Sequence, residues 1–435
     1  MKKSVHFVGI KGVAMTALAV WYKEAGYAVI GSDTTEQFPT DEVLKKAKIS
    51  VLPFDRTNIK NNKPDFVIYT GAHGGRENPE VVEAVKLGIK ILPHGQALGE
   101  IMKNYIQISV AGSHGKTTTS AMIATIFIHA GMDPSYAIGC GEIRGLGLPG
   151  HFGKGNIFVA EADEYVTDPG HDLTPRFMWQ HPDILVETNI DWDHPDVYAS
   201  LAAVRQAFTA LERQSKIVIT NKDFQVMHVS FGQERTFFSL EQHGMKLGDF
   251  TLKVPGRHNA QNAGAAVIAC MELGVSRDKI AEGLVLFGGT KRRFEQVGEC
   301  RGVSVIDDYA HHPKEIMATL AAAREWYPRR RIIAVFQPHT YSRTKALLSE
   351  FAGAFGDAQE VILTDIYSSA RETDTLGISG KTLVEETAKH HPNVLYAPDF
   401  SAVQKVLRTH MRPEDIIIFM GAGDIYGWSK RFITT

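Results

Sequence analysis

The feature that most constrains the fold is a glycine-rich turn between a predicted strand and a predicted helix. The apolar run Ile106–Ala111 leads into Gly112-Ser-His-Gly115-Lys116-Thr117, and a helical stretch follows from Thr118 to Ala130. In such a turn the backbone N–H groups point inward at phosphate, the lysine reaches the β- and γ-phosphates, and the hydroxyl holds Mg²⁺. The sequence therefore predicts a phosphate loop in an α/β domain. It has the short GxxGKT form, because Val110 stands where the strict GxxxxGK[ST] spacing requires glycine.

Predicted strands alternate with helical stretches along the whole chain, in three blocks. The strands expected from apolar runs are Val5–Val8, Ala28–Ile30, Phe66–Tyr69, Ile89–Leu92, Ile106–Ala111, Ile157–Ala160, Ile184–Val186, Val303–Ile306, Ile332–Val335, Val361–Leu363 and Ile416–Phe419. A chain of 435 residues exceeds the size at which a single hydrophobic core stops growing. We therefore expect an α/β fold of three domains with mainly parallel sheets: a Rossmann-like domain over residues 1–105, a central phosphate-loop domain over 106–289 and a Rossmann-like domain over 290–435.

Composition excludes several classes of protein. The net charge of −2 provides no overall basic field that would attract nucleic acid or a membrane surface. The three cysteines, Cys140, Cys270 and Cys300, are odd in number and far apart, which excludes a disulfide framework and fits a reducing cytosol. No run approaches the roughly 18 apolar residues of a membrane helix. We expect a cytoplasmic protein without a nucleic-acid partner and without membrane insertion.

Polar residues follow two predicted strands of the second block. Glu161-Ala-Asp-Glu164 comes directly after one buried strand, and Asn189 opens the segment that ends in Asp193-His194 after the next. Ligands of open α/β sheets sit outside the carboxyl ends of the strands, and Mg²⁺ prefers oxygen ligands. A histidine oriented by a neighbouring carboxylate can also hold a metal. These segments predict a metal site beside the phosphate loop; the alternative is a pair of solvated turns with capping carboxylates.

Taken in chain order, these and further segments resemble the Mur ligases, the cytoplasmic ATP-dependent ligases of peptidoglycan precursor synthesis. The resemblance covers almost the whole chain and rests on Gly9-Ile-Lys-Gly12, Gly31-Ser-Asp33, Gly112-Ser-His-Gly-Lys-Thr-Thr118, Glu161-Ala-Asp-Glu-Tyr165, Thr188-Asn-Ile-Asp-Trp-Asp-His194, Pro255-Gly-Arg-His-Asn-Ala-Gln-Asn262, Lys291-Arg-Arg-Phe-Glu295, Asp307-Asp-Tyr-Ala-His-His-Pro313, Phe336-Gln-Pro-His339 and Gly421-Ala-Gly-Asp424. No one of these motifs is decisive alone, but the ordered set is specific.

The resemblance implies ATP and Mg²⁺ as cofactors and assigns roles to matching residues. The catalytic group would be Lys116, Glu161 and His194, and the metal ligands Thr117, Glu161 and His194. The uridine diphosphate of the substrate would lie near Gly12, Ser32 and Asp33. The ATP site would consist of Gly112, Ser113, His114, Gly115, Lys116, Thr117, Thr118, Asn259, Asn262, Arg293, Asp308, Tyr309 and His311. For the amino acid, position selects His339, Arg343 and Arg371, since an arginine suits an α-carboxylate.

Two branches of the family remain open. The segments Asp307–Pro313 and Phe336–Thr344 look most like the branch that joins L-alanine to UDP-N-acetylmuramate through an acyl phosphate. Tyr165–Trp179 looks closer to the recycling ligases, which attach a whole tripeptide to the same UDP-sugar. The resemblance implies the small-molecule substrates UDP-N-acetylmuramate, L-alanine and ATP, and a monomer or weak homodimer. It also implies that the third block closes onto the second about a hinge near residues 288–292.

Other readings fit the residues less well. An NAD-binding GxGxxG turn would need glycine at positions 11 and 14, where the chain has Lys11 and Ala14. The pair His311-His312 lacks supporting cysteines for zinc, and His390-His391 is expected at a solvated helix end. A non-catalytic, nucleotide-dependent sensor of wall precursors is a distinct alternative, and it would not require the full set of reactive side chains around Lys116.

Overall fold

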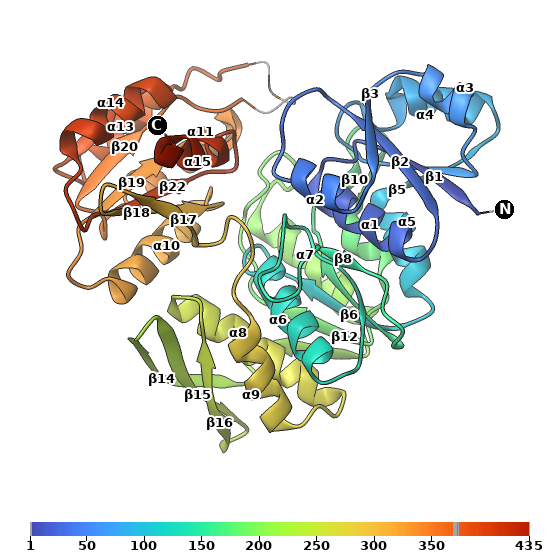
Figure 1. Ribbon diagram of the computed structural model, residues 1–435, viewed down its shortest axis with the longest axis horizontal. Helices are drawn as coiled ribbons and strands as arrows, with labels where there is room; N and C mark the ends of the chain where they lie inside the picture. Colours follow the sequence, from blue (N-terminus) through green and yellow to red (C-terminus); the bar gives the residue numbers. More distant parts are fainter. Residues whose placement is uncertain (1, 369–371, 373, 435) are drawn as a thin grey trace.

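The chain forms three lobes in a computed structural model that describes residues 2–368, 372 and 374–434 (Figure 1). The N-terminal segments lie at the upper right of the view, the middle of the chain lies below them, and the C-terminal segments lie at the upper left. The large sheet of each lobe draws its strands from residues 4–93, 106–220 and 295–420, respectively. The predicted α/β class with three mainly parallel sheets is confirmed. The boundaries at 105/106 and 289/290 stay a prediction.

The first sheet has five strands, all parallel, in the order β3-β2-β1-β4-β5. Strand β1 therefore lies at the centre, and the chain reverses direction across the sheet at β1, which places the turn after β1 at the switch point where α/β sheets bind ligands. The elements are β1 (Ser4–Val8), α1 (Val13–Glu24), β2 (Ala28–Asp33), α2 (Asp41–Lys46), β3 (Ser50–Pro53), α3 (Thr57–Asn62), β4 (Phe66–Tyr69), the 3₁₀ turn η1 (Gly75–Glu77), α4 (Pro79–Lys86), β5 (Lys90–Pro93) and α5 (His94–Met102).

The second sheet has six strands in the order β13-β12-β6-β9-β7-β8, and only the β7–β8 pair is antiparallel. Strands β12, β6 and β9 are neighbours, so the segments that follow them meet at one edge of the sheet. The elements of this part are β6 (Ile106–Ala111), α6 (Lys116–His129), β7 (Ser135–Ala137), β8 (Gly150–His151), β9 (Ile157–Ala162), β12 (Ile184–Glu187), α7 (Leu201–Arg213), β13 (Ile217–Thr220), α8 (Arg257–Glu272) and α9 (Arg277–Leu286).

Two antiparallel insertions in the second lobe were not predicted. The hairpin of β10 (Val166–Asp168) and β11 (Asp172–Pro175), followed by the turn η2 (Arg176–Trp179), packs against the first lobe, where the backbone N–H of Arg76 donates to Asp168 at 2.9 Å. The other is a three-stranded sheet of β14 (Gln225–Gly232), β15 (Arg235–Gln242) and β16 (Met245–Leu252). It shares a hydrophobic core with α8 and α9.

The third sheet has the order β17-β18-β22-β19-β20-β21, with only β17 antiparallel to its neighbour. Its elements are β17 (Glu295–Cys300), β18 (Val303–Asp308), α10 (Pro313–Trp326), β19 (Ile332–Phe336), α11 (Tyr341–Ala346), α12 (Leu348–Ala352), β20 (Glu360–Leu363), α13 (Gly380–Thr387), β21 (Val394–Tyr396), α14 (Phe400–His410), β22 (Ile416–Met420) and α15 (Tyr426–Thr434). The prediction of a solvated helix end after α13 is wrong for His391, which is buried and whose Nε2 lies 3.0 Å from the carbonyl of Ala358.

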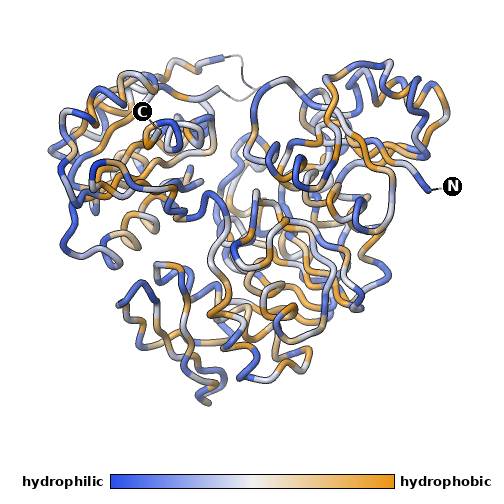
Figure 2. Tube along the Cα trace, in the orientation of Figure 1, coloured by the Kyte–Doolittle hydropathy of each residue, from blue (hydrophilic) through white to orange (hydrophobic). Residues whose placement is uncertain are grey.

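Apolar packing joins the first two lobes, whereas the third lobe has cores of its own. Trp21 of α1 contacts the rings of Phe152 and Phe158 across the boundary, with centroids 5.4 and 6.0 Å apart. The buried residues of the third lobe's two cores all lie between 303 and 432. Figure 2 shows the hydrophobic stretches following the inner strands of each lobe.

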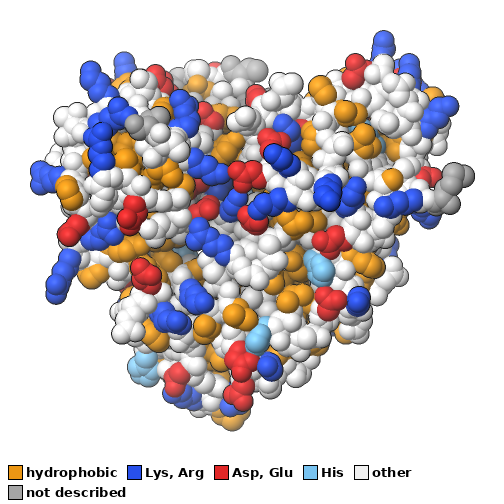
Figure 3. Space-filling view, in the orientation of Figure 1, with side chains coloured by type: hydrophobic (Ala, Val, Ile, Leu, Met, Phe, Trp, Pro, Cys, Tyr) orange, Lys and Arg blue, Asp and Glu red, His pale blue; other side chains and the backbone are white. Residues whose placement is uncertain are grey.

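The third lobe meets the other two through polar contacts. Lys291 pairs with Glu42 of the first lobe at 2.9 Å and with Glu142 of the second at 3.4 Å, and the Tyr426 hydroxyl donates to the carbonyl of Gln37 at 2.5 Å. Charged side chains of both signs crowd the face where the lobes meet (Figure 3). Polar interfaces within a chain are typical of domains that move relative to one another. None of the helices in the described part of the chain has the length and apolarity that crossing a bilayer requires.

Candidate active site at the phosphate loop

The phosphate loop connects β6 to α6 and depends on two glycines. Gly112 has φ +139° and Gly115 has φ +87°. A Cβ on Gly112 would lie 2.0 Å from Thr188 Oγ1, and one on Gly115 would lie 2.6 Å from Asn262 Oδ1. Only glycine satisfies both the backbone conformation and the close approach. The loop therefore curls tightly against its neighbours, and α6 begins at Lys116 with its N-terminus facing the loop.

Lys116 is the cation of this loop and is surrounded by acid. Its Nζ donates to Glu164 Oε2 at 2.9 Å and to the carbonyl of Gly112 at 2.5 Å. Burial by itself would lower the pKa of Lys116, but the carboxylates of Glu164 and Asp163 outweigh burial and raise the pKa above its usual value. The lysine is therefore charged at any physiological pH.

The acidic side chains beside Lys116 form two groups. Glu161 accepts from the N–H of Gly139 at 2.6 Å, and the Thr117 hydroxyl beside it acts to lower the pKa of its carboxyl. Burial raises the pKa of Glu161, against the lowering influence of Lys116. The second group is Glu164, Asp193 and His194, whose ligand atoms lie within 4.8 Å of one another.

The three residues predicted as metal ligands are thus divided between these groups. Thr117 and Glu161 contact each other, while His194 lies with Glu164, their atoms Nε2 and Oε1 being 3.8 Å apart. Within the described residues, Glu164 Oε1 is buried and accepts no hydrogen bond. A buried carboxylate oxygen without a partner is costly unless a cation meets it. The donor set of carboxylates, a hydroxyl and an imidazole therefore fits a divalent cation.

The predicted nucleotide contacts on α8 also face the loop. Asn259 and Asn262 are both buried, and Asn262 Nδ2 donates to Asn259 Oδ1 at 3.3 Å. Asn259 Nδ2 in turn donates to the carbonyl of Pro255 at 2.7 Å. Helical spacing of three residues places both amides on one face of α8, and that face packs on Gly115.

The third lobe contributes a cationic group. The Arg293 guanidinium lies over the ring of Tyr309 at 5.1 Å and 3.7 Å from the Glu315 carboxylate. His311 Nδ1 is 3.2 Å from the other oxygen of Glu315. Asp308 is committed to its own lobe, accepting from the N–H groups of Phe294 and Ala310 at 2.6 and 2.8 Å.

Two of the three amino-acid candidates, Arg343 and His339, lie at the same junction. Arg343 Nη2 is 3.1 Å from Asp193 Oδ1, so this arginine of α11 reaches the segment that carries His194. The ring of His339 stacks on Tyr367 with centroids 5.8 Å apart and lies 6.4 Å from the ring of His311. Arg371, the third candidate, lies outside the described residues.

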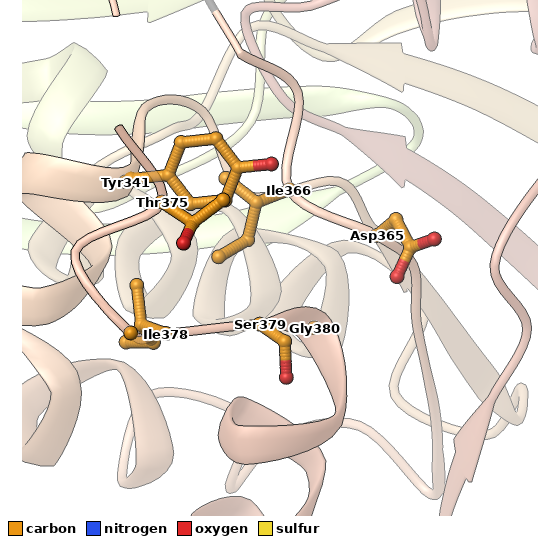
Figure 4. A pocket seen from close by; sticks show the side chains of 8 residues that line it. Tyr341, Asp365, Ile366, Thr375, Ile378, Ser379 and Gly380 are labelled. Carbon is orange, nitrogen blue, oxygen red and sulfur yellow. The ribbon is translucent and has the colours of Figure 1, made fainter. Parts of the chain in front are cut away.

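A cavity of about 520 Å³ opens on the third lobe next to α11 (Figure 4). Tyr341 and Ile366 line it together with Ile378, and Asp365 stands at one side. The other lining residues are Thr375, Gly377, Ser379 and Gly380.

Of the residues predicted near the uridine diphosphate, Gly12 lies in the turn after β1, and Ser32 and Asp33 end the neighbouring strand β2. Asp33 accepts from the backbone N–H of Lys11 at 2.7 Å, and His73 Nε2 lies 3.8 Å from Asp33 Oδ1. The hydroxyl of Ser32 is fully buried and donates to Glu80, so this side chain faces the interior of the lobe. Lys11 turns away from the turn: its Nζ donates to the carbonyl of Glu36 at 2.5 Å and lies 3.3 Å from Asp41.

Comparisons with known proteins identify the family. Residues 4–106 match the model described as "Mur ligase family, catalytic domain", residues 110–270 match the "Mur ligase middle domain", and residues 292–423 match the "Mur ligase, glutamate ligase domain". The chain belongs to the Mur ligase family.

Relatives of this Mur ligase match it from end to end. A UDP-N-acetylmuramate–L-alanine ligase of Desulfitobacterium hafniense is 38% identical over 98% of both chains. One of Caldanaerobacter subterraneus is 39% identical over 99% of this chain and 97% of the relative. The solved UDP-N-acetylmuramate–alanine ligase MurC of Thermotoga maritima has a TM-score of 0.83 and 28% identity, covering 99% of this chain and 98% of its own. A murein peptide ligase of Psychrobacter arcticus shares the fold, with a TM-score of 0.71 at 24% identity.

Two residues of this Mur ligase site received no individual role from the sequence, although Glu164 lies in the acidic segment predicted to bind a metal. Glu164 pairs with Lys116, and its position in the acidic turn after β9 was a usable signal. Glu315 contacts Arg293, His311 and the loop residue His114, yet it sits on a helix in the other half of the chain. No local pattern relates it to the phosphate loop, because the contact depends on how the third lobe docks.

Proposed function

We propose that this chain uses ATP to join L-alanine to the carboxylate of UDP-N-acetylmuramate, a step of peptidoglycan precursor synthesis. The observation that carries the proposal is a phosphate-loop lysine, Lys116, buried among carboxylates at the junction that Arg293 and Arg343 reach from the third lobe. A site that only binds nucleotide does not require this convergence. The names of the full-length relatives supply the two substrates.

The three blocks take separate tasks in this proposal. Residues 1–105 bind the UDP-substrate at Gly12, Ser32 and Asp33, residues 106–289 bind ATP, and residues 290–435 bind the amino acid at His339, Arg343 and Arg371. The supporting feature is that the turn after β1 and the phosphate loop after β6 each lie at the carboxyl ends of central strands.

The first chemical step activates the carboxylate, because a carboxylate oxygen is a poor leaving group. An oxygen of the UDP-N-acetylmuramate carboxylate attacks the γ-phosphorus of ATP, the bond to the β–γ bridging oxygen breaks, and ADP leaves with that electron pair. Lys116 stays protonated beside Glu164 and stabilises charge on the transferred oxygens. Removing one such preorganised donor costs about 10² to 10³ in kcat.

The second step forms the amide. The free amine of L-alanine attacks the carbonyl carbon of the acyl phosphate, and phosphate leaves with the electron pair of the broken C–O bond as the nitrogen loses a proton. Arg343 and His339 would hold the α-carboxylate of the amino acid, since a guanidinium binds a carboxylate in a bidentate manner. Orientation by such a clamp converts an encounter into an intramolecular reaction.

Mg²⁺ fits the acidic groups described above and is part of the proposal. Thr117, Glu161 and His194 would hold it, with Glu164 and Asp193 as neighbouring carboxylates. Bound there, Mg²⁺ supplies charge neutralisation on the phosphoryl oxygens. The chain's own part is to keep these carboxylates buried and convergent.

The tripeptide-adding alternative rested on Tyr165–Trp179. In the structure this segment is largely the β10–β11 hairpin, which packs on the first lobe through Asp168 and Arg76. That placement favours a structural role for the segment and leaves L-alanine as the preferred acceptor.

One assay panel tests the proposal. UDP-N-acetylmuramate and ATP are offered with L-alanine, glycine, L-serine or the tripeptide, and product mass and phosphate release are measured. We expect phosphate release that requires both UDP-N-acetylmuramate and L-alanine, and a product heavier by one alanine residue. Release from ATP alone would favour a switch or motor, and a tripeptide adduct would favour the recycling reaction.

A further inference from the structure

His114 of the phosphate loop lies between two carboxylates from different lobes. Its Nδ1 is 3.1 Å from Glu315 Oε1, on α10 of the third lobe, and its Nε2 is 3.4 Å from Asp191 Oδ2, in the segment after β12. The imidazole and both carboxylates are largely buried, with side-chain exposures of 17%, 10% and 18%. Lys314, next to Glu315, also pairs with Asp191.

The electrostatics make His114 a fixed cation. Burial would lower its pKa, but Asp191 and Glu315 outweigh burial and raise the pKa of His114 to about 9. The ring of His312 lies 4.9 Å from that of His114. Burial, and after it the charge of His114, lowers the pKa of His312 to about 4. The neutral His312 ring can therefore lie against the cationic one. The Arg293 guanidinium and the imidazole of His311 also face Glu315.

The backbone of His114 is held independently of the third lobe. Its N–H donates to Asn189 Oδ1 at 2.9 Å, and its carbonyl accepts from Thr188 Oγ1 at 2.6 Å and Asn189 Nδ2 at 2.8 Å. All of these partners belong to the second lobe. The side chain is thus the part of this residue whose environment changes when the third lobe docks.

We propose that His114 is a positioning residue for ATP, and that Glu315 fixes its imidazole in place only when the third lobe is docked on the phosphate loop. Two carboxylates hold the ring in one orientation, so the imidazole at the phosphate loop reaches a single geometry in the docked state. Without Glu315, Asp191 is the carboxylate that remains beside the ring among the described residues. This inference rests on the proposed ATP-dependent function and adds to it a contact that links lobe closure to the phosphate site.

The test uses the full-length enzyme with variants Glu315→Gln, His114→Gln and His114→Lys, and a double variant of the two glutamine substitutions. The matched control is Glu325→Gln. Glu325 lies on the same helix α10 and pairs with Arg257 of the second lobe at 2.6 Å, but its partner is largely exposed. We expect Glu315→Gln and His114→Gln each to raise the KM for ATP about tenfold with a smaller fall in kcat, and Glu325→Gln to change neither.

Three results support the contact itself. The double variant should be no worse than either single variant, because both remove the same interaction. His114→Lys, which keeps a cation facing Glu315, should recover most of the ATP affinity. The pKa of His114, followed by NMR of labelled histidine, should fall in Glu315→Gln and stay unchanged in Glu325→Gln.

The outcomes separate this inference from the proposed function. If the effects of the two glutamine substitutions on the KM for ATP multiply in the double variant, the positioning role is overturned while the ligase assignment stands. The same conclusion follows if Glu315→Gln leaves the KM for ATP unchanged and the wild-type enzyme binds ATP. Wild-type enzyme that binds no ATP in a direct titration would overturn the proposed function. Equal losses in Glu315→Gln and Glu325→Gln would mean that lobe docking in general, and not His114, is responsible, which also overturns the inference.

Discussion

Replacing Lys116 by methionine should damage stability as well as catalysis, and the structure gives the size of both effects. The ion pair with Glu164 is short, 2.9 Å, with side-chain exposures of 16% for the lysine and 2% for the glutamate. Glu164 Oε1 already accepts no hydrogen bond within the described residues, so losing Lys116 leaves a buried carboxylate with the His194 ring, 3.8 Å away, beside it. Removing one partner of a buried pair costs about 3–5 kcal/mol. Because the Lys116 side chain keeps 16% of its surface exposed, we expect the lower end, about 3 kcal/mol.

The assay separates the two effects by adding Glu164→Gln to Lys116→Met. The neutral amide costs less to bury than a stranded carboxylate, so the double variant should recover most of the loss in the free energy of unfolding measured in urea. Neither variant should recover ligation, which we expect to fall by at least about 10². A double variant as unstable as Lys116→Met would refute the stranded-carboxylate reasoning, and near-normal turnover by Lys116→Met would refute the role of the loop.

Two further predictions concern packing and pH. Gly99→Ala on α5 would place a Cβ 2.2 Å from the carbonyl oxygen of Trp179, so we expect the free energy of unfolding, measured by heat or urea, to fall by about 1–3 kcal/mol. The control Gly427→Ala on α15, which has open space around it, should be neutral or slightly stabilising. Equal effects of the two substitutions would contradict the steric argument. Burial and the facing Glu212 raise the pKa of Glu187 from 4.5 to about 7. A raised folded-state pKa gives stability that is complete below pH 4.5 and lost as pH rises through 7. As the pH rises from 5 to 8, the free energy of unfolding of Glu212→Gln should therefore fall by about 1 kcal/mol less than that of the wild type. Parallel pH profiles of the two proteins would refute the pairing of Glu187 with Glu212.

Local patterns predicted the strands that form the middle of each sheet. The apolar runs at Phe66–Tyr69, Ile106–Ala111 and Val361–Leu363 coincide with β4, β6 and β20, because a buried parallel strand is apolar on both faces. Most edge and antiparallel strands escaped prediction, although the run Ile89–Leu92 anticipated the edge strand β5 (Lys90–Pro93). In β14 (Gln225–Gly232), exposed and half-buried residues are mixed, so the strand carries too little apolar signal to be recognised.

The short phosphate loop, the acidic turn after β9 and the order of motifs were readable in the sequence itself. Each depends on residues that are close along the chain, where glycine conformations and strand ends act locally. Tertiary structure alone decided which side chains meet across lobes. His114 and Glu315 are 201 positions apart, and Arg343 reaches Asp193 from a helix of another lobe. Such contacts follow from how lobes dock, and docking is set by surfaces assembled from many distant segments, so no local pattern encodes them.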